Sequence, residues 1–230
     1  RGDKVADAII LLVMLLLLCF FLYPLLNMLS ISVSNEHAVL RADVTFYPIG
    51  FNAQAYSLIF QSQDLWRSFG NSLFVAGVGC VFSLLALCVA AYPLAFGDFY
   101  GKKLYNLIIL FTMWFSGGII PTYMVIKSVG LLNSVWSMII PCAINTYNLI
   151  ILRNFFTGMP RELEESAMLD GCTEVGVLFR IILPVSKPAI TTVTLFYAVD
   201  RWNEWFHASL FLSNSKLWPV QLQLRQILQV

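Results

Sequence analysis

The chain has 230 residues, of which 59% are hydrophobic and 12% charged, and it carries a net charge of +1. Soluble domains contain about 45–50% apolar and about 25% charged residues, so this composition excludes an ordinary soluble protein. The sequence also lacks long runs of Lys and Arg, which argues against a nucleic-acid-binding surface. Together with a mean hydropathy of +0.77, these values predict a membrane protein.

Five apolar stretches are long enough to cross a membrane, because a helix needs about 20 mostly apolar residues to span the hydrocarbon core. These stretches cover residues 8–31, 71–96, 104–126, 135–152 and 188–212. Their length, and the absence of a two-residue alternation, favour helices over barrel strands. We therefore predict an all-α membrane protein, a polytopic helical bundle that forms a single domain over residues 1–230.

The basic residues of the loops indicate the orientation, because Lys and Arg accumulate on the cytoplasmic side. An N-terminus in the cytoplasm places on the inner side Arg1, Lys4, Lys102, Lys103, Arg153, Arg161, Arg180 and Lys187. The outer side then holds the smaller set Arg41, Arg67, Lys127, Lys216 and Arg225. Loop 32–70 is expected outside the cell and loop 153–187 inside it. Five spans leave the last residues outside, so we expect a sixth span after Val230.

Prolines and cysteines add two expectations. Pro24, Pro93, Pro121 and Pro141 lie in or near the spans, where the missing backbone donor is expected to bend a helix. The five cysteines are Cys19, Cys80, Cys88, Cys142 and Cys172. Their spacing is not that of metal ligands, so we expect neither a metal site nor a disulfide framework.

The inner loop 153–187 has the signals of two short helices. Pro160 is placed to open a helix over Arg161–Asp170, and Gly171 to close it. Thr173 is placed to cap a second helix that runs to Leu183 and stops at Pro184. The loop is therefore predicted to form a compact two-helix knob beneath the membrane.

The same loop contains a spaced motif. Glu165-Ser166-Ala167 is followed by three residues and Gly171, and then by nine residues and Ile181-Ile182-Leu183-Pro184. This pattern resembles the EAA loop of binding-protein-dependent ABC importer permeases, with Ser166 in place of the usual Ala. Segments 115–123, 154–156 and 202–206 are similar to the carbohydrate-uptake branch, which includes maltose-type permeases and permeases for oligosaccharides and polysaccharide fragments.

The resemblance implies a non-catalytic permease subunit with the type I importer fold, in the bacterial cytoplasmic (inner) membrane. Its implied partners are a second homologous permease, two ATPase subunits and an extracytoplasmic solute-binding protein. ATP and Mg²⁺ would bind to the ATPase subunits, and this chain would need no cofactor. Segment 97–103 lacks the spacing of a phosphate-binding loop. The expected cargo is a sugar, in particular an oligosaccharide.

We expect the knob to dock on the ATPase through Leu163, Glu165, Ser166, Ala167, Met168, Asp170 and Gly171. Small residues at 167 and 171 would let the partner approach the backbone. Leu163, Ala167 and Met168 would add apolar contacts, and Glu165 would offer its carboxylate to a basic residue. The competing interpretation is a solvated acidic loop, which the full spacing of the motif disfavours.

Polar and aromatic side chains within the spans are candidates for the solute path, since ionisable groups in a membrane are costly. These candidates are Trp114, Asn145, Asn148, Asp200, Arg201, Asn203, Glu204 and Trp205. A structural role is equally open: Arg201 and Glu204 have the spacing of an ion pair within one helix, and Asn145 and Asn148 that of contacts between helices. Trp205 also suits an interfacial aromatic belt.

Two other functions remain open at this stage. An ion- or proton-coupled secondary transporter would use Asp200, Glu204 and His207 as a relay, although we find no paired repeats with broken helices. A membrane enzyme or assembly factor is the other alternative, although the sequence has no recognisable catalytic motif.

Overall fold

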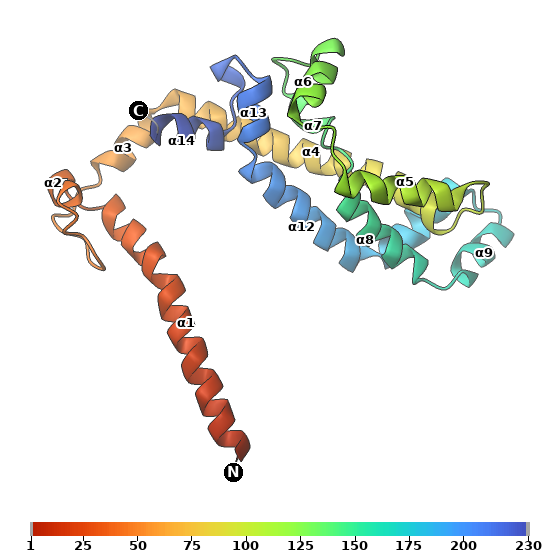
Figure 1. The fold of residues 1–230 in the computed structure, drawn as a ribbon, viewed down its shortest axis with the longest axis horizontal. Helices are drawn as coiled ribbons and strands as arrows, with labels where there is room; N and C mark the ends of the chain where they lie inside the picture. Colours follow the sequence, from red (N-terminus) through yellow and green to blue (C-terminus); the bar gives the residue numbers. More distant parts are fainter. Residues whose placement is uncertain (1, 229–230) are drawn as a thin grey trace. The chain divides into compact units, whose positions relative to one another are not determined.

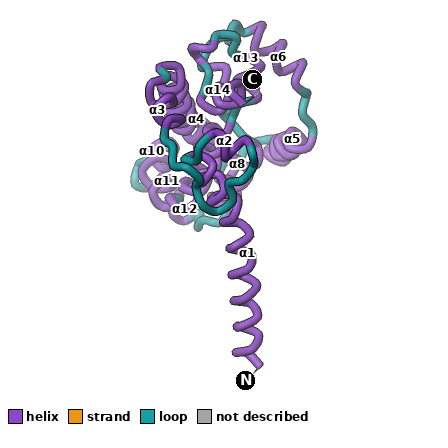
Figure 2. Tube along the Cα trace, turned by 90° about the vertical axis from the view of Figure 1, so that its left-hand side faces the viewer, coloured by secondary structure: helices purple, strands orange, loops and turns teal. Residues whose placement is uncertain are grey.

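A computed structural model describes residues 2–228, and within this range the chain forms helices, turns and loops without any strand (Figures 1 and 2). The chain divides into two compact units, Arg1–Gln63 and Asp64–Val230. The all-helical architecture agrees with the prediction from the sequence. Each unit is described by itself.

The first unit contains α1 (Gly2–Ser32), α2 (Glu36–Leu40) and α3 (Gln54–Gln61). The apolar side chains of α1 are exposed along the helix, which suits a helix surrounded by lipid or by another subunit. The loop after α1 folds back on its end, because Asn27 Nδ2 donates to the carbonyl oxygens of Val44 (3.1 Å) and Thr45 (2.8 Å). Ser30 Oγ donates to the carbonyl oxygen of Phe46 in the same way.

The second unit is built on α4 (Gln63–Ala95), a helix of 33 residues with Pro93 in its last turn. Helix α8 (Thr146–Thr157) packs against both α5 (Lys102–Trp114) and α12 (Lys187–Asn203). The main apolar core joins α4, α8 and α12, with fully buried side chains at Leu87, Leu152 and Val193. A smaller core, which includes Val75 of α4 and Ile139, lies around α13 (Phe206–Phe211) and α14 (Val220–Leu228).

The prediction of one continuous helix over 104–126 is wrong. Helix α5 ends at Trp114, and α6 (Ile119–Ser128) leaves at an angle of 113°. Gly118 has φ +86°, a conformation that few residues other than glycine adopt. Pro121 lies in the first turn of α6, where its missing donor is tolerated. The chain therefore turns at the glycines and starts a new helix.

The helices expected over 135–152 and 188–212 are also broken. In 135–152, α7 (Trp136–Ile139) and α8 are separated by a break over 140–145 that contains Pro141. Asn145 caps the start of α8, which makes the restart favourable. In 188–212, α12 ends at Asn203 and α13 begins at Phe206. Glu204 Oε1 accepts the His207 N–H (2.9 Å) at the start of α13.

Two helices among the described residues are long and apolar enough to span a membrane, namely Lys4–Ser32 within α1 and Gln63–Ala95. The number rises to four if each bent pair counts as one span. These pairs are α5 with α6, and Glu174–Val185 with α12, which meet at 85°. The structure thus has several apolar spans.

Candidate functional site

The expected knob begins with α9 (Glu162–Leu169), which confirms the helix predicted over Arg161–Asp170. Its end is a Schellman motif: the Gly171 N–H donates to the Met168 carbonyl oxygen, and the Cys172 N–H to that of Ala167, both at 3.0 Å. Gly171 has φ +84°, which explains a glycine at this position of the motif.

The second helix of the knob starts as predicted and ends later than predicted. Thr173 Oγ1 accepts the Gly176 N–H (3.2 Å) and caps α10 (Glu174–Val177). The chain then continues through a π-helical turn, η1 (Leu178–Ile182), into α11 (Leu183–Val185), so Pro184 does not stop the helix. The widened turn already interrupts the regular hydrogen-bond ladder, and a proline without an N–H is tolerated just after it.

The knob, residues 162–185, is joined to the helical core by a hydrogen bond and by apolar packing. Tyr92 Oη of α4 donates to Glu164 Oε1 at 2.8 Å. Ala167, Val177 and Ile182 are buried in the main core together with residues of α4, α8 and α12. Arg161 and Asp98, which lies in the loop after α4, add an ion pair at 4.0 Å on the surface. The knob is therefore a packed extension of the core (Figure 1).

The outer face of the knob carries most of the predicted docking residues. Leu163, Glu165, Ser166, Met168, Asp170 and Gly171 are exposed. Ala167 is buried, which corrects the expectation that it offers an apolar contact: it is the residue through which α9 packs on the core. Sequence analysis missed Leu169, whose side chain is 88% exposed, and Val175, at 66%. Leu169 and Val175 are apolar residues in a polar loop, and this contrast could have identified them from the sequence.

Three of the predicted path residues meet in one open groove of about 700 Å³ between the start of α8 and α12. Its lining residues are Asn145, Tyr147, Asn148, Leu195, Phe196, Val199 and Asp200. Asn145 Oδ1 accepts the Asn148 N–H (3.2 Å), so it caps α8 and also borders the groove. The groove combines amides, aromatic rings and a carboxylate, the kinds of groups that bind sugar hydroxyls and ring faces.

The five other predicted path residues, Arg201 among them, do not line this groove. Trp114 lies at the end of α5. Asn203 Nδ2 donates to the Val199 carbonyl oxygen within its own helix (2.9 Å). The Trp205 ring lies under the Arg225 guanidinium, with the guanidinium carbon 3.5 Å from the ring centroid. Glu204 pairs with His207, with 2.9 Å between Oε2 and Nδ1.

Arg201 differs most from its predicted role. Its side chain is only 4% exposed, and its guanidinium donates to the carbonyl oxygens of Met138, Ile139 and Cys142 and to Ser83 Oγ. The ion pair of Arg201 with Glu204, which the sequence left open as an alternative, is not formed, because the two side chains have different partners. The two terminal nitrogens make all of these bonds, and a guanidinium buried in this way is not exposed to a passing solute.

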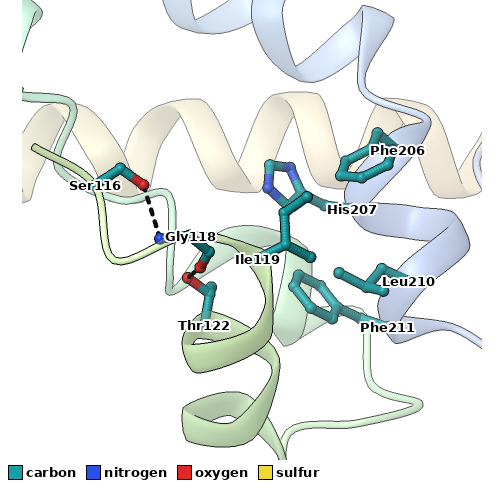
Figure 3. A pocket seen from close by; sticks show the side chains of 8 residues that line it. All are labelled: Ser116, Gly118, Ile119, Thr122, Phe206, His207, Leu210 and Phe211. Carbon is teal, nitrogen blue, oxygen red and sulfur yellow. Dashed lines mark hydrogen bonds between the residues drawn. The ribbon is translucent and has the colours of Figure 1, made fainter.

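A smaller hollow of about 140 Å³ lies between the bent α5–α6 segment and α13. Figure 3 shows Ser116, Gly118 and Thr122 on one side of it, and His207 and Phe211 on the other. The Gly118 N–H donates to Ser116 Oγ (3.1 Å), and Thr122 Oγ1 donates to the Gly118 carbonyl oxygen (2.8 Å). These polar groups thus have partners within the turn, and the hollow is a packing feature of the bend.

Comparisons with known proteins bear on this geometry. The family model of the "Binding-protein-dependent transport system inner membrane component" matches residues 78–229. Protein LplC of Bacillus subtilis (strain 168) is 46% identical over 204 residues, which cover 89% of this chain and 69% of that protein. The "Polygalacturonan/rhamnogalacturonan transport system permease protein YtcP" of the same organism is 42% identical over 219 residues, 95% of this chain and 76% of that protein.

A solved structure also matches. A chain from the crystal structure of "a bacterial ABC transporter involved in the import of the acidic polysaccharide alginate" superposes with a TM-score of 0.93 and 31% identity, over 98% of this chain and 81% of that chain. The resemblance noted in the sequence is thereby confirmed. By sequence and by fold, the chain belongs to the inner membrane components of binding-protein-dependent transport systems, the permease subunits of ABC importers.

Proposed function

We propose that this chain pairs with a second homologous permease to form the path by which an oligosaccharide enters the cell. A solute-binding protein delivers the sugar outside, and two ATPase subunits, which bind ATP and Mg²⁺, drive the cycle from inside. The chain itself is a non-catalytic membrane subunit. The names of YtcP and of the alginate transporter support a carbohydrate cargo released from a polysaccharide.

The observation that carries the proposal is the packed knob with an exposed acidic and apolar face. Leu163 and Met168 supply apolar contact area for a cleft on the ATPase, and the Glu165 carboxylate pairs there with a basic residue. Ser166, Asp170 and Gly171 border the same contact. Ala167 contributes indirectly, because its burial holds α9 on the core.

The knob is suited to pass motion to the membrane helices. Its buried side chains share one core with α4, α8 and α12, and close-packed interiors transmit displacement rather than absorb it. The hydrogen bond between Tyr92 and Glu164 adds a polar link to α4. Movement of the ATPase would therefore shift the helices that border the groove.

For the topology, we place the N-terminus in the cytoplasm and five apolar segments across the membrane, over 8–31, 71–96, 104–126, 135–152 and 188–212. Loop 32–70 then faces outward and loop 153–187 inward. The bend between α5 and α6 favours a segment over 104–126 that crosses with a break, a backbone arrangement found where a segment lines a cavity or packs on protein. This topology places the knob on the side of the ATPases.

Within the path, we assign solute contacts to Asn145 and Asp200, which border the groove and are exposed. Asn148 also borders the groove but is buried, as is Arg201, so neither is assigned a contact. The ion-coupled alternative needs Asp200, Glu204 and His207 to act in one row. Asp200 borders the groove, whereas Glu204 and His207 pair with each other. That arrangement gives the relay no support.

The test is ATP-dependent uptake by the complete transporter in proteoliposomes, with the solute-binding protein supplied. We expect Glu165→Lys to lower uptake about thirtyfold or more, since placing like charges together at an interface costs about 2 kcal/mol or more. Glu165→Gln should have a smaller effect. Glu36→Lys, which reverses an exposed acid in the first turn of α2, is the matched control and should leave uptake unchanged. Full uptake by Glu165→Lys would refute the proposed coupling.

A further inference from the structure

We propose that Arg201 and Tyr197 are positioning residues that hold the broken segment between α7 and α8 in shape and thereby fix one wall of the groove. The hydrogen bonds made by Arg201 and Tyr197 are features of the fold and do not depend on the proposed function. Only the link to solute movement rests on the proposed function.

The break over 140–145 creates a problem of backbone hydrogen bonding. A helix that ends at Ile139 and restarts at Thr146 leaves carbonyl and N–H groups without their usual intrahelical partners. Such groups are costly when buried, and more so in a membrane, where water does not replace the lost partners. Ile139 is fully buried and Ala143 nearly so, so this segment needs partners from elsewhere in the protein.

Arg201 supplies most of these partners. Its guanidinium donates to the Ile139 carbonyl oxygen at 3.2 Å and to that of Cys142 at 2.9 Å, and it also reaches the carbonyl oxygen of Met138. A fourth bond, at 2.9 Å, goes to Ser83 Oγ of α4. A guanidinium is a rigid planar fork with five N–H donors, so it can serve several carbonyl groups at once.

The positive charge of Arg201 is surrounded by backbone carbonyl groups. Among the ion pairs of the described residues, none joins this guanidinium to a carboxylate. Carbonyl oxygens at the end of α7 and in the break surround the cation instead, and the carbonyl end of a helix favours positive charge. The break therefore stabilises Arg201, and Arg201 in turn stabilises the break.

Tyr197 lies four residues before Arg201, which places both side chains on one face of α12. Its hydroxyl accepts the Asn145 N–H (3.0 Å) and donates to the Ala143 carbonyl oxygen (3.2 Å). Asn145 is the cap residue of α8, so this hydroxyl fixes the point at which α8 begins. Tyr197 and Arg201 together serve backbone groups from Met138 to Asn145.

Helix α4 leaves room for this arrangement. A Cβ atom on Gly79 would lie 3.2 Å from Arg201 Nε and 3.3 Å from its Cδ, closer than most Cβ contacts. Ser83, one turn further along α4, supplies the hydroxyl that Arg201 binds. Gly79 thus provides space for the Arg201 side chain, and Ser83, four residues later, provides a hydrogen-bond acceptor for it.

The consequence is that the two walls of the groove are tied together. Asn145, Tyr147 and Asn148 come from the start of α8, while Phe196 and Asp200 come from α12. One face of α12 binds the break, and the neighbouring face borders the groove. Without these bonds, the start of α8 loses its fixed position relative to α12.

The test uses Cys142, a native cysteine inside the break whose own carbonyl oxygen binds Arg201. In one form of the chain the other cysteines are replaced by Ala, so that only Cys142 remains. A second form keeps only Cys88, which is buried in the main core and reports general loosening. Labelling of each thiol by a membrane-permeant maleimide is followed over time in the reconstituted complete transporter.

Tyr197→Phe is the deciding variant, because it removes only the hydroxyl. We expect labelling of Cys142 to rise about fivefold or more, because the variant loses both hydrogen bonds of the hydroxyl and loss of one ordinary bond alone corresponds to about fivefold. Labelling of Cys88 should stay unchanged. Arg201→Lys should raise Cys142 labelling further, since a single ammonium does not reproduce the fork. Tyr105→Phe removes an exposed hydroxyl on α5 and should change neither reporter.

Unchanged labelling of Cys142 in Tyr197→Phe would overturn the inference, and so would an equal rise at Cys142 and Cys88. If Arg201→Lys fails to assemble, Tyr197→Phe still decides the question. Uptake is measured in parallel and should fall severalfold in Tyr197→Phe. A rise at Cys142 with full uptake would support the positioning role and contradict the groove as the solute path, so the two failures are distinguishable.

Discussion

The knob and the broken segment between α7 and α8 are both short and irregular, but they are stabilised in different ways. The knob is closed by local bonds, such as Thr173 Oγ1 to the Gly176 N–H and the Schellman motif at Gly171. The broken segment depends on Arg201 and Tyr197, which lie more than 50 positions further along the chain. The knob takes its shape from these local bonds and packs on the main core through Ala167, Val177 and Ile182, whereas the broken segment takes its shape from bonds to a distant helix.

This difference suggests a division of roles. A locally stabilised element can move as a unit when a partner displaces it. An element held by a distant helix responds when that helix shifts, so it is suited to change the groove during transport. Three substitutions test this division, and the one with the largest expected effect is at Arg201.

Arg201→Met should destabilise the protein most. It leaves the carbonyl groups of the break without their shared donor, and each unsatisfied buried group costs about 1–3 kcal/mol. The measurement is thermal unfolding of the purified complex, with Arg41→Met, at an exposed position directly after α2, as control for loss of an arginine. A melting temperature equal to that of the unaltered complex would show that the break does not depend on Arg201.

Gly171→Ala should weaken the knob by about 1–2 kcal/mol, because φ +84° is unfavourable for a residue with a Cβ. The loss should appear as lower recovery of ATPase subunits with the purified permease. Gly70→Ala is the control, since a Cβ there has open space and the φ of Gly70 is not in the left-handed region. Equal recovery for both variants would contradict the role of Gly171 in shaping the docking face.

Tyr92→Phe should have the smallest effect, a loss of about 1 kcal/mol from the bond to Glu164. We expect the ratio of sugar transported to ATP hydrolysed to fall, with ATPase binding unchanged, because the knob remains formed but is less firmly linked to α4. Tyr105→Phe is again the control. A fall in ATPase binding without a change in this ratio would place Tyr92 in docking instead.

Local signals explain what could be predicted from the sequence. Pro160, Gly171 and Thr173 act within a few residues of their own positions, so the start of each helix in the knob could be inferred from the chain. The helix breaks were harder: Gly118 and Pro141 marked two of them, but apolar composition alone favoured continuous helices. An apolar composition indicates that a segment avoids water, but it does not indicate whether the backbone of that segment forms one regular helix.

Partners distant in the sequence explain what could not be predicted. From the sequence, Arg201 was a candidate for the solute path or for an ion pair with Glu204, three positions away. Its observed acceptors lie 59 to 63 positions earlier and, at Ser83, 118 positions earlier. Ala167 was placed on the docking face, although one residue of α9 has to face the core for the knob to pack. Both errors arise because a side chain's orientation depends on tertiary packing.

The central claim is that the outer face of the knob contacts the ATPase. The most direct measurement is crosslinking in the complete transporter from a single introduced cysteine, Glu165→Cys in a chain without its native cysteines, with Glu36→Cys in α2 as the matched exposed control. We predict that the cysteine at position 165 crosslinks to an ATPase subunit and that the one at position 36 does not. Absence of an ATPase crosslink from position 165, or an equal yield from both positions, would contradict this account.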